Sequence, residues 1–136
     1  MAARVLIVQS REALAHATGR QLQGAGFEPT LALDGDVALR SARIDPPDAV
    51  LLDLTLPVLD GWLVLAALAD AEQPVKIVVY GERADEGRAL QLGADVFVSD
   101  WGMVSDGLRR LIEEHNPWRP SPAITSRRRT TAGASD

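Results

Sequence analysis

The sequence predicts an α/β domain in which helices cover both faces of a five-stranded parallel sheet. Five short apolar runs alternate with stretches of helical periodicity along the 136 residues. The inner residues of three of these runs are uncharged, as parallel strands buried on both faces require. Strands and helices that alternate in this way imply right-handed crossovers, and therefore a three-layer, doubly wound arrangement.

Each strand and helix follows from a local pattern in the chain. Apolar or alternating runs rich in β-branched residues predict strands at residues 4–8, 27–33, 49–54, 75–80 and 96–98. Apolar residues at helical spacing predict helices at residues 11–24, 36–44, 61–71, 84–92 and 103–115. The natural strand order is 2-1-3-4-5, that of flavodoxin-like folds, which brings the carboxyl ends of strands one, three and four together.

Polar residues, glycines and prolines mark the ends of the predicted helices. Ser10 is a candidate N-cap of the first helix, and Gly26 is placed to end that helix as a C′ glycine. Pro46 stops the second helix because proline cannot continue it, and Gly93 ends the fourth. The residues expected near the inner face of the first helix are Leu14, Ala17, Leu22 and Ala25.

Composition limits the classes of protein to be considered. The chain contains no cysteine, which excludes disulfides, thiolate chemistry and cysteine-based zinc sites. Its apolar runs are too short for a signal peptide or for a span of the bilayer. The net charge of −5 argues against nucleic acid as the main partner. We therefore expect a cytoplasmic protein that binds other proteins, and neither nucleic acid nor membranes.

The chain is predicted to divide into an ordered domain, residues 1–116, and a disordered basic tail, residues 117–136. Beyond Asn116 the apolar periodicity ends, and Pro, Ser, Thr and Arg become frequent. The tail holds four arginines and one aspartate, whereas the preceding body is acidic. We expect no output domain after the tail, and we therefore expect the ordered domain to act alone.

Residues 50–62 form the most informative segment of the chain. An apolar run ends in Asp53, Pro57 follows, and an Asp60-Gly61 turn precedes the next helix. This pattern places a carboxylate at the carboxyl end of a strand, where open α/β sheets bind ligands and carry out chemistry. The spacing of the aspartate, proline and glycine resembles the phospho-acceptor strand and loop of response-regulator receiver domains. Gly93-Ala94-Asp95 resembles the family's turn before the fifth strand.

The resemblance covers residues 4–115 and implies a role in two-component phosphorelay signalling, with Asp53 at the phospho-acceptor position. In that family two acids after the first strand hold Mg²⁺, a hard cation that prefers carboxylate oxygens. Gln9 and Ser10 occupy those two positions here. The resemblance therefore implies neither a metal site nor a cofactor, unless Glu12 in the first helical turn supplies a ligand for Mg²⁺.

Two further family positions also differ in this chain. The threonine or serine at the end of the fourth strand corresponds to Gly81, or to Tyr80 if the alignment slips by one residue. The lysine after the fifth strand corresponds to Asp100, which reverses the charge. One ion pair at ~4 Å is worth about 4 kcal/mol at an effective dielectric near 20, so this reversal opposes a phosphoryl group. Phe97 matches the family's aromatic switch position, but without the hydroxyl its partner is missing, and we expect it to pack in the core.

We interpret the chain as a divergent pseudo-receiver, not an enzyme, that binds proteins independently of phosphorylation. Its partner, a second copy of the chain or a histidine kinase, would recognise the face formed by helix four, strand five and helix five. The first alternative is an ordinary response regulator phosphorylated on Asp53. The second is an enzyme or small-molecule binder of the same fold, such as a flavin protein. We favour it less because residues 9–12 lack a Ser/Thr/Gly cluster for a flavin phosphate and no nucleophile–base pair is visible.

Several side chains near the predicted site have two interpretations. Asp53 either keeps a functional role or serves as a structural carboxylate that caps the following loop through backbone N–H groups. Arg11 and Arg83 either pair with an acid of the site or are solvated, and solvation is favoured. Trp101 and Met103 either form an exposed docking patch or pack in the core.

Overall fold

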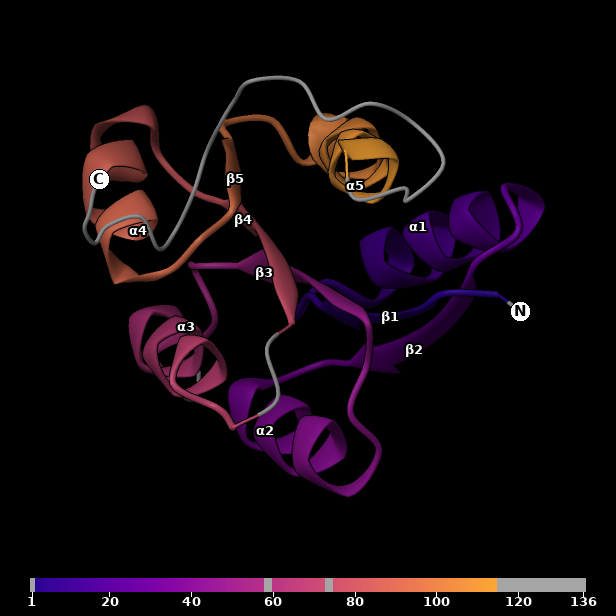
Figure 1. Ribbon diagram of the computed structural model, residues 1–136, viewed down its shortest axis with the longest axis horizontal. Helices are drawn as coiled ribbons and strands as arrows, with labels where there is room; N and C mark the ends of the chain where they lie inside the picture. The colour runs from indigo at the N-terminus through magenta and orange to yellow at the C-terminus, as the bar shows by residue number, and fades with distance from the viewer. Residues whose placement is uncertain (1, 58–59, 73–74, 115–136) are drawn as a thin grey trace.

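Five parallel strands form the centre of the molecule in the order β2-β1-β3-β4-β5 (Figure 1). The structure is a computed structural model that describes residues 2–57, 60–72 and 75–114. The strands are β1 (Arg4–Val8), β2 (Glu28–Ala32), β3 (Ala49–Asp53), β4 (Lys76–Tyr80) and β5 (Val96–Val98). The predicted strand order and parallel pairing are therefore confirmed.

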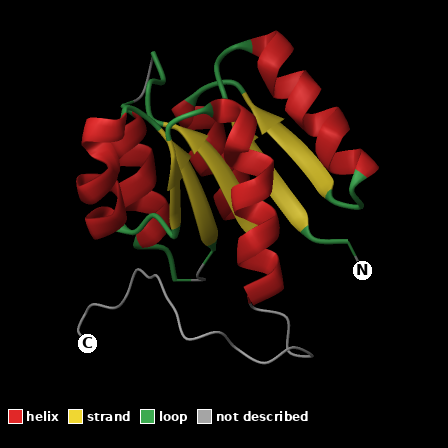
Figure 2. Ribbon diagram, turned by 90° about the horizontal axis from the view of Figure 1, so that it is seen from above, coloured by secondary structure: helices red, strands yellow, loops and turns green. Residues whose placement is uncertain are grey.

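Helices cover both faces of the sheet (Figure 2). The helices of the described part are α1 (Glu12–Gly24), α2 (Gly35–Ile44), α3 (Gly61–Ala69), α4 (Glu86–Leu92) and α5 (Val104–Glu114). The first and last of them pack on one face, and the other three pack on the opposite face (Figure 1). Short 3-10 turns, η1 (Arg83–Asp85) and η2 (Trp101–Met103), precede α4 and α5.

The sheet separates two layers of apolar core. Successive residues of β1 alternate between the layers, so that Ile7 faces α1 and α5 whereas Val8 faces α2, α3 and α4. Both side chains are 0% exposed. Burial of one such side chain stabilises the fold by about 1.5–3 kcal/mol, which explains why these strands are apolar on both faces.

Two predicted helices begin differently in the structure. The predicted helix at residues 84–92 starts as the 3-10 turn η1, and the predicted helix at residues 103–115 is preceded by η2. The assignment of Ser10 as the N-cap of α1 is wrong, because the cap is Arg11 and no side chain caps the helix. The predicted tail at residues 117–136 lies outside the described residues.

The expected inner face of α1 is wrong in part. Leu22 is buried and Leu14 is partly buried, but Ala17 and Ala25 are exposed. The buried residues of the helix are Ala15, Thr18, Gly19 and Leu22. A polar threonine is buried here because its hydroxyl is fully bonded, as described below, and sequence periodicity does not register such bonds.

Two glycines that end helices adopt left-handed backbone conformations. Gly26 follows α1 with φ +95°, and Gly93 follows α4 with φ +126°. Residues with a Cβ rarely adopt these angles, so both predicted helix ends have a physical cause. Within the described ranges, no helix combines the length and the apolarity needed to cross a membrane.

Candidate functional site

The carboxyl ends of β1, β3 and β4 lie together at one edge of the sheet, as the strand order predicts. Asp53 is the last residue of β3, and its register partner on β4 is Tyr80. β1 pairs Val8 with Leu52, so the following residue, Gln9, lies beside Asp53. The candidate site is therefore built around these neighbouring strand ends.

The Asp53 side chain is buried and hydrogen-bonded to the loop that follows it. The residue is 4% exposed. Its Oδ1 accepts two hydrogen bonds from Thr55, at 2.8 Å from the backbone N and at 2.7 Å from Oγ1. This is the geometry of an Asx turn, which fixes the direction of the chain as it leaves the strand. Thr55 was not singled out from the sequence, although its position two residues after an aspartate is the signal for such a turn.

Neither arginine considered from the sequence pairs with an acid of the site. Arg11 and Arg83 are exposed, and neither forms an ion pair within the described residues. The favoured interpretation, two solvated arginines, agrees with the structure. The Asp53 carboxylate therefore has no cationic side chain as a partner in the part of the chain that is described.

The loop after Asp53 packs closely against the start of α3. Asp60 caps this helix, because its Oδ1 accepts a hydrogen bond of 2.9 Å from Trp62 N. A Cβ at Gly61 would lie only 2.4 Å from the carbonyl oxygen of Leu54, so a side chain there would push the loop and helix apart. The loop also contains the exposed Pro57. The spacing between the aspartate and the glycine therefore has a packing cause.

Gln9 occupies a fully buried position next to Asp53. Its exposed fraction is 0%, and its Oε1 accepts a hydrogen bond of 3.1 Å from Arg11 N. Its Nε2 is the one buried side-chain polar atom of the described residues that has no hydrogen-bond partner. Ser10 is partly exposed, and Glu12 is exposed at the start of α1.

Gly81 leaves space that two apolar side chains occupy. A Cβ at this position would lie 2.9 Å from Leu54 Cδ1 and 3.3 Å from Phe97 Cε1. Phe97 packs against the core on the face of α2, α3 and α4, as expected. Tyr80, the alternative for the hydroxyl position, packs with the core on the opposite face. The side-chain direction therefore favours Gly81 as the residue that faces Phe97.

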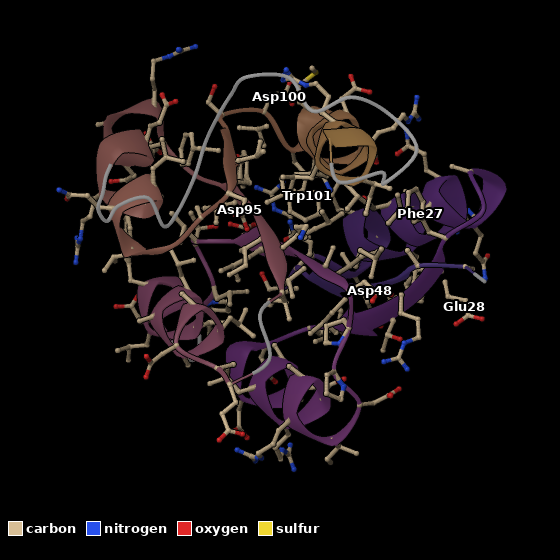
Figure 3. All side chains as sticks on the ribbon, in the orientation of Figure 1. Phe27, Glu28, Asp48, Asp95, Asp100 and Trp101 are labelled. Carbon is tan, nitrogen blue, oxygen red and sulfur yellow. The ribbon has the colours of Figure 1, made fainter. Side chains whose placement is uncertain are left out.

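Asp100 and Trp101 adopt different environments although they are adjacent. Asp100 is exposed, and its Oδ1 caps η2 by accepting a hydrogen bond of 3.0 Å from Gly102 N. Trp101 is 8% exposed and lies between α5 and the sheet (Figure 3). Met103 is 46% exposed. Of the two residues considered for an exposed patch, Trp101 thus belongs to the core and Met103 to the surface.

The Gly93-Ala94-Asp95 turn has a structural role. Asp95 Oδ2 accepts a hydrogen bond of 2.8 Å from Ile77 N, which ties the start of β5 to β4. A Cβ at Gly93 would lie 2.4 Å from Ala69 Cβ, so a glycine permits α4 to end against α3. Both contacts position the short edge strand that carries Phe97.

One contact that the sequence did not suggest joins α3 to α4. The guanidinium carbon of Arg88 lies 4.3 Å from the centroid of the Trp62 ring, a cation–π geometry. The two residues are 26 positions apart, and no spacing rule connects them. Such a contact at a partly exposed site is worth about 0.5–1 kcal/mol.

The donor atoms around Asp53 do not fit a Mg²⁺ ion, the cation that the family's two acids after the first strand hold. Mg²⁺ is usually held by one or two carboxylates together with waters. Gln9 presents a neutral amide whose oxygen already accepts the Arg11 N–H group, and its nitrogen can only donate. In the described ranges no cluster of three or more His, Cys, Asp or Glu side chains could hold a metal. Asp53 is thus the sole carboxylate among the residues that occupy the family's ligand positions.

A parallel sheet in this order, with an aspartate at the end of its third strand, is the arrangement expected of receiver-type signalling domains. The chain belongs to the response regulator receiver domain family, whose family model matches residues 5–101. Receiver domains of this family act in two-component signalling, where they interact with histidine kinases and with effector or partner domains. They are in general non-enzymatic, although one relative, from Anaeromyxobacter dehalogenans, is a protein-glutamate methylesterase/protein-glutamine glutaminase.

Curated relatives are longer than this chain. The transcriptional regulatory protein PrrA of Mycobacterium tuberculosis is 39% identical over 98 residues, which cover 70% of this chain and 42% of PrrA. The response regulator PleD of Caulobacter vibrioides is 34% identical over 104 residues, which cover 73% of this chain and 23% of PleD. The chain thus spans less than half the length of these relatives.

Solved receiver structures share the fold. The chemotaxis response regulator CheY4 of Vibrio cholerae superimposes with a TM-score of 0.73 at 25% identity, covering 82% of this chain and 99% of that one. A CheY-like receiver domain protein from Methanospirillum hungatei gives a TM-score of 0.76 at 19% identity, covering 84% and 96%. At that identity the second likeness shows the fold alone.

Proposed function

We propose that this receiver domain is a protein-interaction module whose binding does not require phosphorylation of Asp53. The observation that carries the proposal is the fully buried Gln9 amide beside Asp53, at a position where the family places a metal-binding acid. A phosphorylated aspartate carries added negative charge, and a divalent cation normally neutralises it. The Gln9 side chain replaces a negative ligand with a neutral donor, so the cation loses one of its attachment points.

Asp100 supports the same proposal. It stands at the position of the family's lysine, and its carboxylate is held by Gly102 N as the cap of η2. A cation at ~4 Å from a phosphoryl group would contribute about 4 kcal/mol at an effective dielectric near 20. In this chain the attraction of the lysine is absent, and the loop between β5 and α5 carries the negative charge of Asp100 instead. The carboxylate is exposed, so solvent reduces its repulsion.

Gly81, which directly follows β4, supports the same proposal. The family's hydroxyl at this position would bond a phosphoryl oxygen, but glycine has none. Leu54 and the Phe97 ring lie where a side chain at Gly81 would project. The packing of Phe97 therefore does not depend on a bond to a transferred group.

The proposed docking face is formed by α4, β5 and α5. Leu90, Leu92 and Met103 are 39%, 37% and 46% exposed, respectively. β5 is an edge strand that pairs only with β4 within the described residues. Exposed apolar side chains beside a short strand edge are typical of a surface that associates with another protein. The proposed partner is a histidine kinase or a second copy of the chain.

One observation favours the second candidate, an ordinary response regulator phosphorylated on Asp53. Both hydrogen bonds to the Asp53 carboxylate go to Oδ1, so Oδ2 accepts none from the described residues. A phosphoryl group could then form on Oδ2. Glu12 would have to supply an ion ligand, and an arginine would have to replace the lysine.

A phosphorylation assay distinguishes the two candidates. The protein is incubated with Mg²⁺ and acetyl phosphate, and separately with Mg²⁺ and beryllofluoride, and intact mass and ¹⁹F NMR are recorded. We expect no adduct at Asp53. The matched positive control is the variant Gln9→Asp/Ser10→Asp/Gly81→Thr/Asp100→Lys, which should gain an adduct. An adduct on the unmodified protein that is absent from Asp53→Asn would establish the ordinary regulator instead.

A further inference from the structure

A groove of about 500 Å³ lies between the second halves of α2 and α3. These helices lead into β3 and β4, so the groove lies toward the edge of the sheet where the strands begin. Its charged lining residues are Arg43 and Glu72. Ligand pockets are commonly about 300–1,000 Å³ in volume and mainly apolar, so the groove has the size and polarity of a binding site. The apolar lining includes Leu39, Ala42, Pro46, Leu68, Ala71 and Val75.

The helix that forms one wall of the groove also exposes apolar side chains to its outer side. α3 has the sequence GWLVLAALA and no charged residue. Leu63 is 58% exposed, and Ala66 and Ala67 are exposed as well. A surface helix normally carries polar residues on its outer face, whereas a helix that is apolar on all sides is normally covered. The apolar surface beside the groove therefore favours a further segment or protein that covers it.

The charges at the end of α3 favour a basic occupant. Asp70 and Glu72 follow this helix, whose last turn contains no basic residue. The carbonyl groups at a helix C-terminus carry partial negative charge, so acids at that end are unfavourable without a nearby cation. Neither acid forms an ion pair within the described residues. Because Arg43 lies on the α2 side of the groove, cations are expected to bind on the α3 side.

The C-terminal residues of this chain contain the side chains that such a surface attracts. Ile124 is followed by three arginines at residues 127–129. One short segment thus combines an aliphatic side chain for the groove with cations for the two acids. α5, at the front of Figure 2, ends at Glu114 at the edge of the sheet where β1 begins. The groove lies toward the same edge, on the opposite face of the sheet.

The chain between Glu114 and Ile124 is long enough to reach the groove. Passing from the layer of α5 to the layer of α2 and α3 requires about 20 Å, since a helix with its side chains is about 10–12 Å across. The ten residues from 115 to 124 span at most about 33–36 Å when fully extended. Pro117, Pro120 and Pro122 lie in this stretch, and proline-rich segments favour an extended backbone.

We propose that residues 123–129 dock on the groove between α2 and α3 of the same chain, with Ile124 against the apolar lining and the three arginines beside Asp70 and Glu72. The contact covers apolar surface and supplies the cations that the end of α3 lacks. Another protein that binds this groove must first displace the segment. The groove shares no residue with the docking face of α4, β5 and α5, so this inference does not depend on the proposed function.

Paramagnetic relaxation in the full chain tests the contact. The sequence has no cysteine, so Ser126→Cys carries a single nitroxide spin label. We expect the label to broaden the ¹H–¹⁵N signals of Ala42 and Ala71, which line the groove. The signals of Arg11 and Gly102, which follow the carboxyl ends of β1 and β5, should stay sharp. Sharp groove signals, or equal broadening at both edges of the sheet, overturn the proposal.

Variants of the labelled protein test the two kinds of contact separately. Ile124→Ser removes the aliphatic side chain, and Asp70→Asn/Glu72→Gln removes two exposed charges without affecting the core. Each should reduce the broadening at the groove by at least about twofold, since exposed ion pairs and single apolar contacts are individually weak. The matched control is Trp118→Ser, which lies outside the docking segment and should leave the broadening unchanged. Undiminished broadening in Ile124→Ser contradicts the proposed contact.

A mixed sample distinguishes docking within one chain from docking on a second copy. Protein labelled with ¹⁵N and free of nitroxide is mixed with unlabelled protein that carries the nitroxide. Sharp groove signals in the mixture, together with broadened ones in the singly labelled chain, support the proposal. Broadened groove signals in the mixture overturn it and identify a second copy as the occupant.

Discussion

Trp101 Nε1 donates a hydrogen bond of 2.9 Å to Thr18 Oγ1, across 83 positions of the chain. Thr18 Oγ1 in turn donates to Leu14 O at 2.9 Å, so the hydroxyl is used both as donor and as acceptor. The Trp101 ring also meets the Tyr80 ring edge-on, with centroids 5.9 Å apart. The turn before α5 is thereby attached to α1 and to β4 beneath the proposed docking face.

Substitution of Thr18 by valine should weaken this attachment. Thr18→Val keeps the shape of the side chain but leaves the buried indole N–H unpaired, which costs about 1–3 kcal/mol. Urea unfolding followed by circular dichroism measures the loss. The double variant Thr18→Val/Trp101→Phe should lose less than the sum of the single losses, because the unpaired donor is gone. Thr30→Val, at an exposed position of β2, is the matched control and should change stability by under about 0.5 kcal/mol.

Two glycine-to-alanine substitutions should have opposite effects. Gly61→Ala places a methyl group 2.4 Å from the Leu54 carbonyl oxygen, where backbone must move. We expect a loss of at least about 2 kcal/mol in the free energy of unfolding. Gly87→Ala, inside α4, meets no atom within 4 Å and should gain about 0.5–1 kcal/mol. Equal effects of the two substitutions in urea unfolding would contradict the packing explanation of Gly61.

The loop that ends at Gly61 is one of the features that could be predicted from the sequence alone. The spacing of Asp53 and Gly61 predicts a strand, a tight loop and a helix, because a local turn and a close approach depend on neighbouring residues. The strand order follows similarly, since crossover handedness leaves few alternatives. The alternation of strands and helices was therefore enough to bring the carboxyl ends of the first, third and fourth strands together.

The features that could not be predicted from the sequence depend on side-chain hydrogen bonds, several of them between distant segments of the chain. Ala17 matches the apolar pattern and is exposed, whereas Thr18 breaks the pattern and is buried because Trp101 bonds it. The exposed orientation of Asp100 is also a consequence of a local cap that spacing rules did not include. Side-chain hydrogen bonds of this kind override hydrophobic periodicity without leaving a sequence signal.

Gly81→Thr should displace the Phe97 ring. The new Cβ would lie 2.9 Å from Leu54 Cδ1 and 3.3 Å from Phe97 Cε1, so one of these side chains must move. We expect a stability loss of about 1–3 kcal/mol, typical of overpacking. The chain has two phenylalanines, so ¹⁹F NMR of fluorophenylalanine-labelled protein gives two signals. The Phe97 signal should shift and the Phe27 signal should not; an unchanged pair would show that Leu54 alone adjusts.

Substitution of Asp53 separates its structural role from phosphorylation. Asp53→Asn keeps an oxygen for both Thr55 hydrogen bonds, whereas Asp53→Ala removes it. We expect the alanine variant to lose about 1.5–3 kcal/mol in urea unfolding, because hydrogen bonds to a charged group are lost, and the asparagine variant to lose less. Binding to the protein partner should persist in Asp53→Asn. If that variant folds but no longer binds, the proposed independence from phosphorylation is wrong.

Charge on the docking face should disrupt association without unfolding the domain. Met103 is 46% exposed before α5, and Met103→Lys introduces a charge where the proposed partner would bury an apolar side chain. We expect the partner affinity to fall by at least about tenfold, equivalent to about 1.4 kcal/mol. Size-exclusion chromatography with light scattering measures self-association, and calorimetric titration measures binding to a kinase. Leu33→Lys is the matched control, because Leu33 is 38% exposed directly after β2, at the opposite edge of the sheet. Equal losses in the two variants would move the docking face away from α4, β5 and α5.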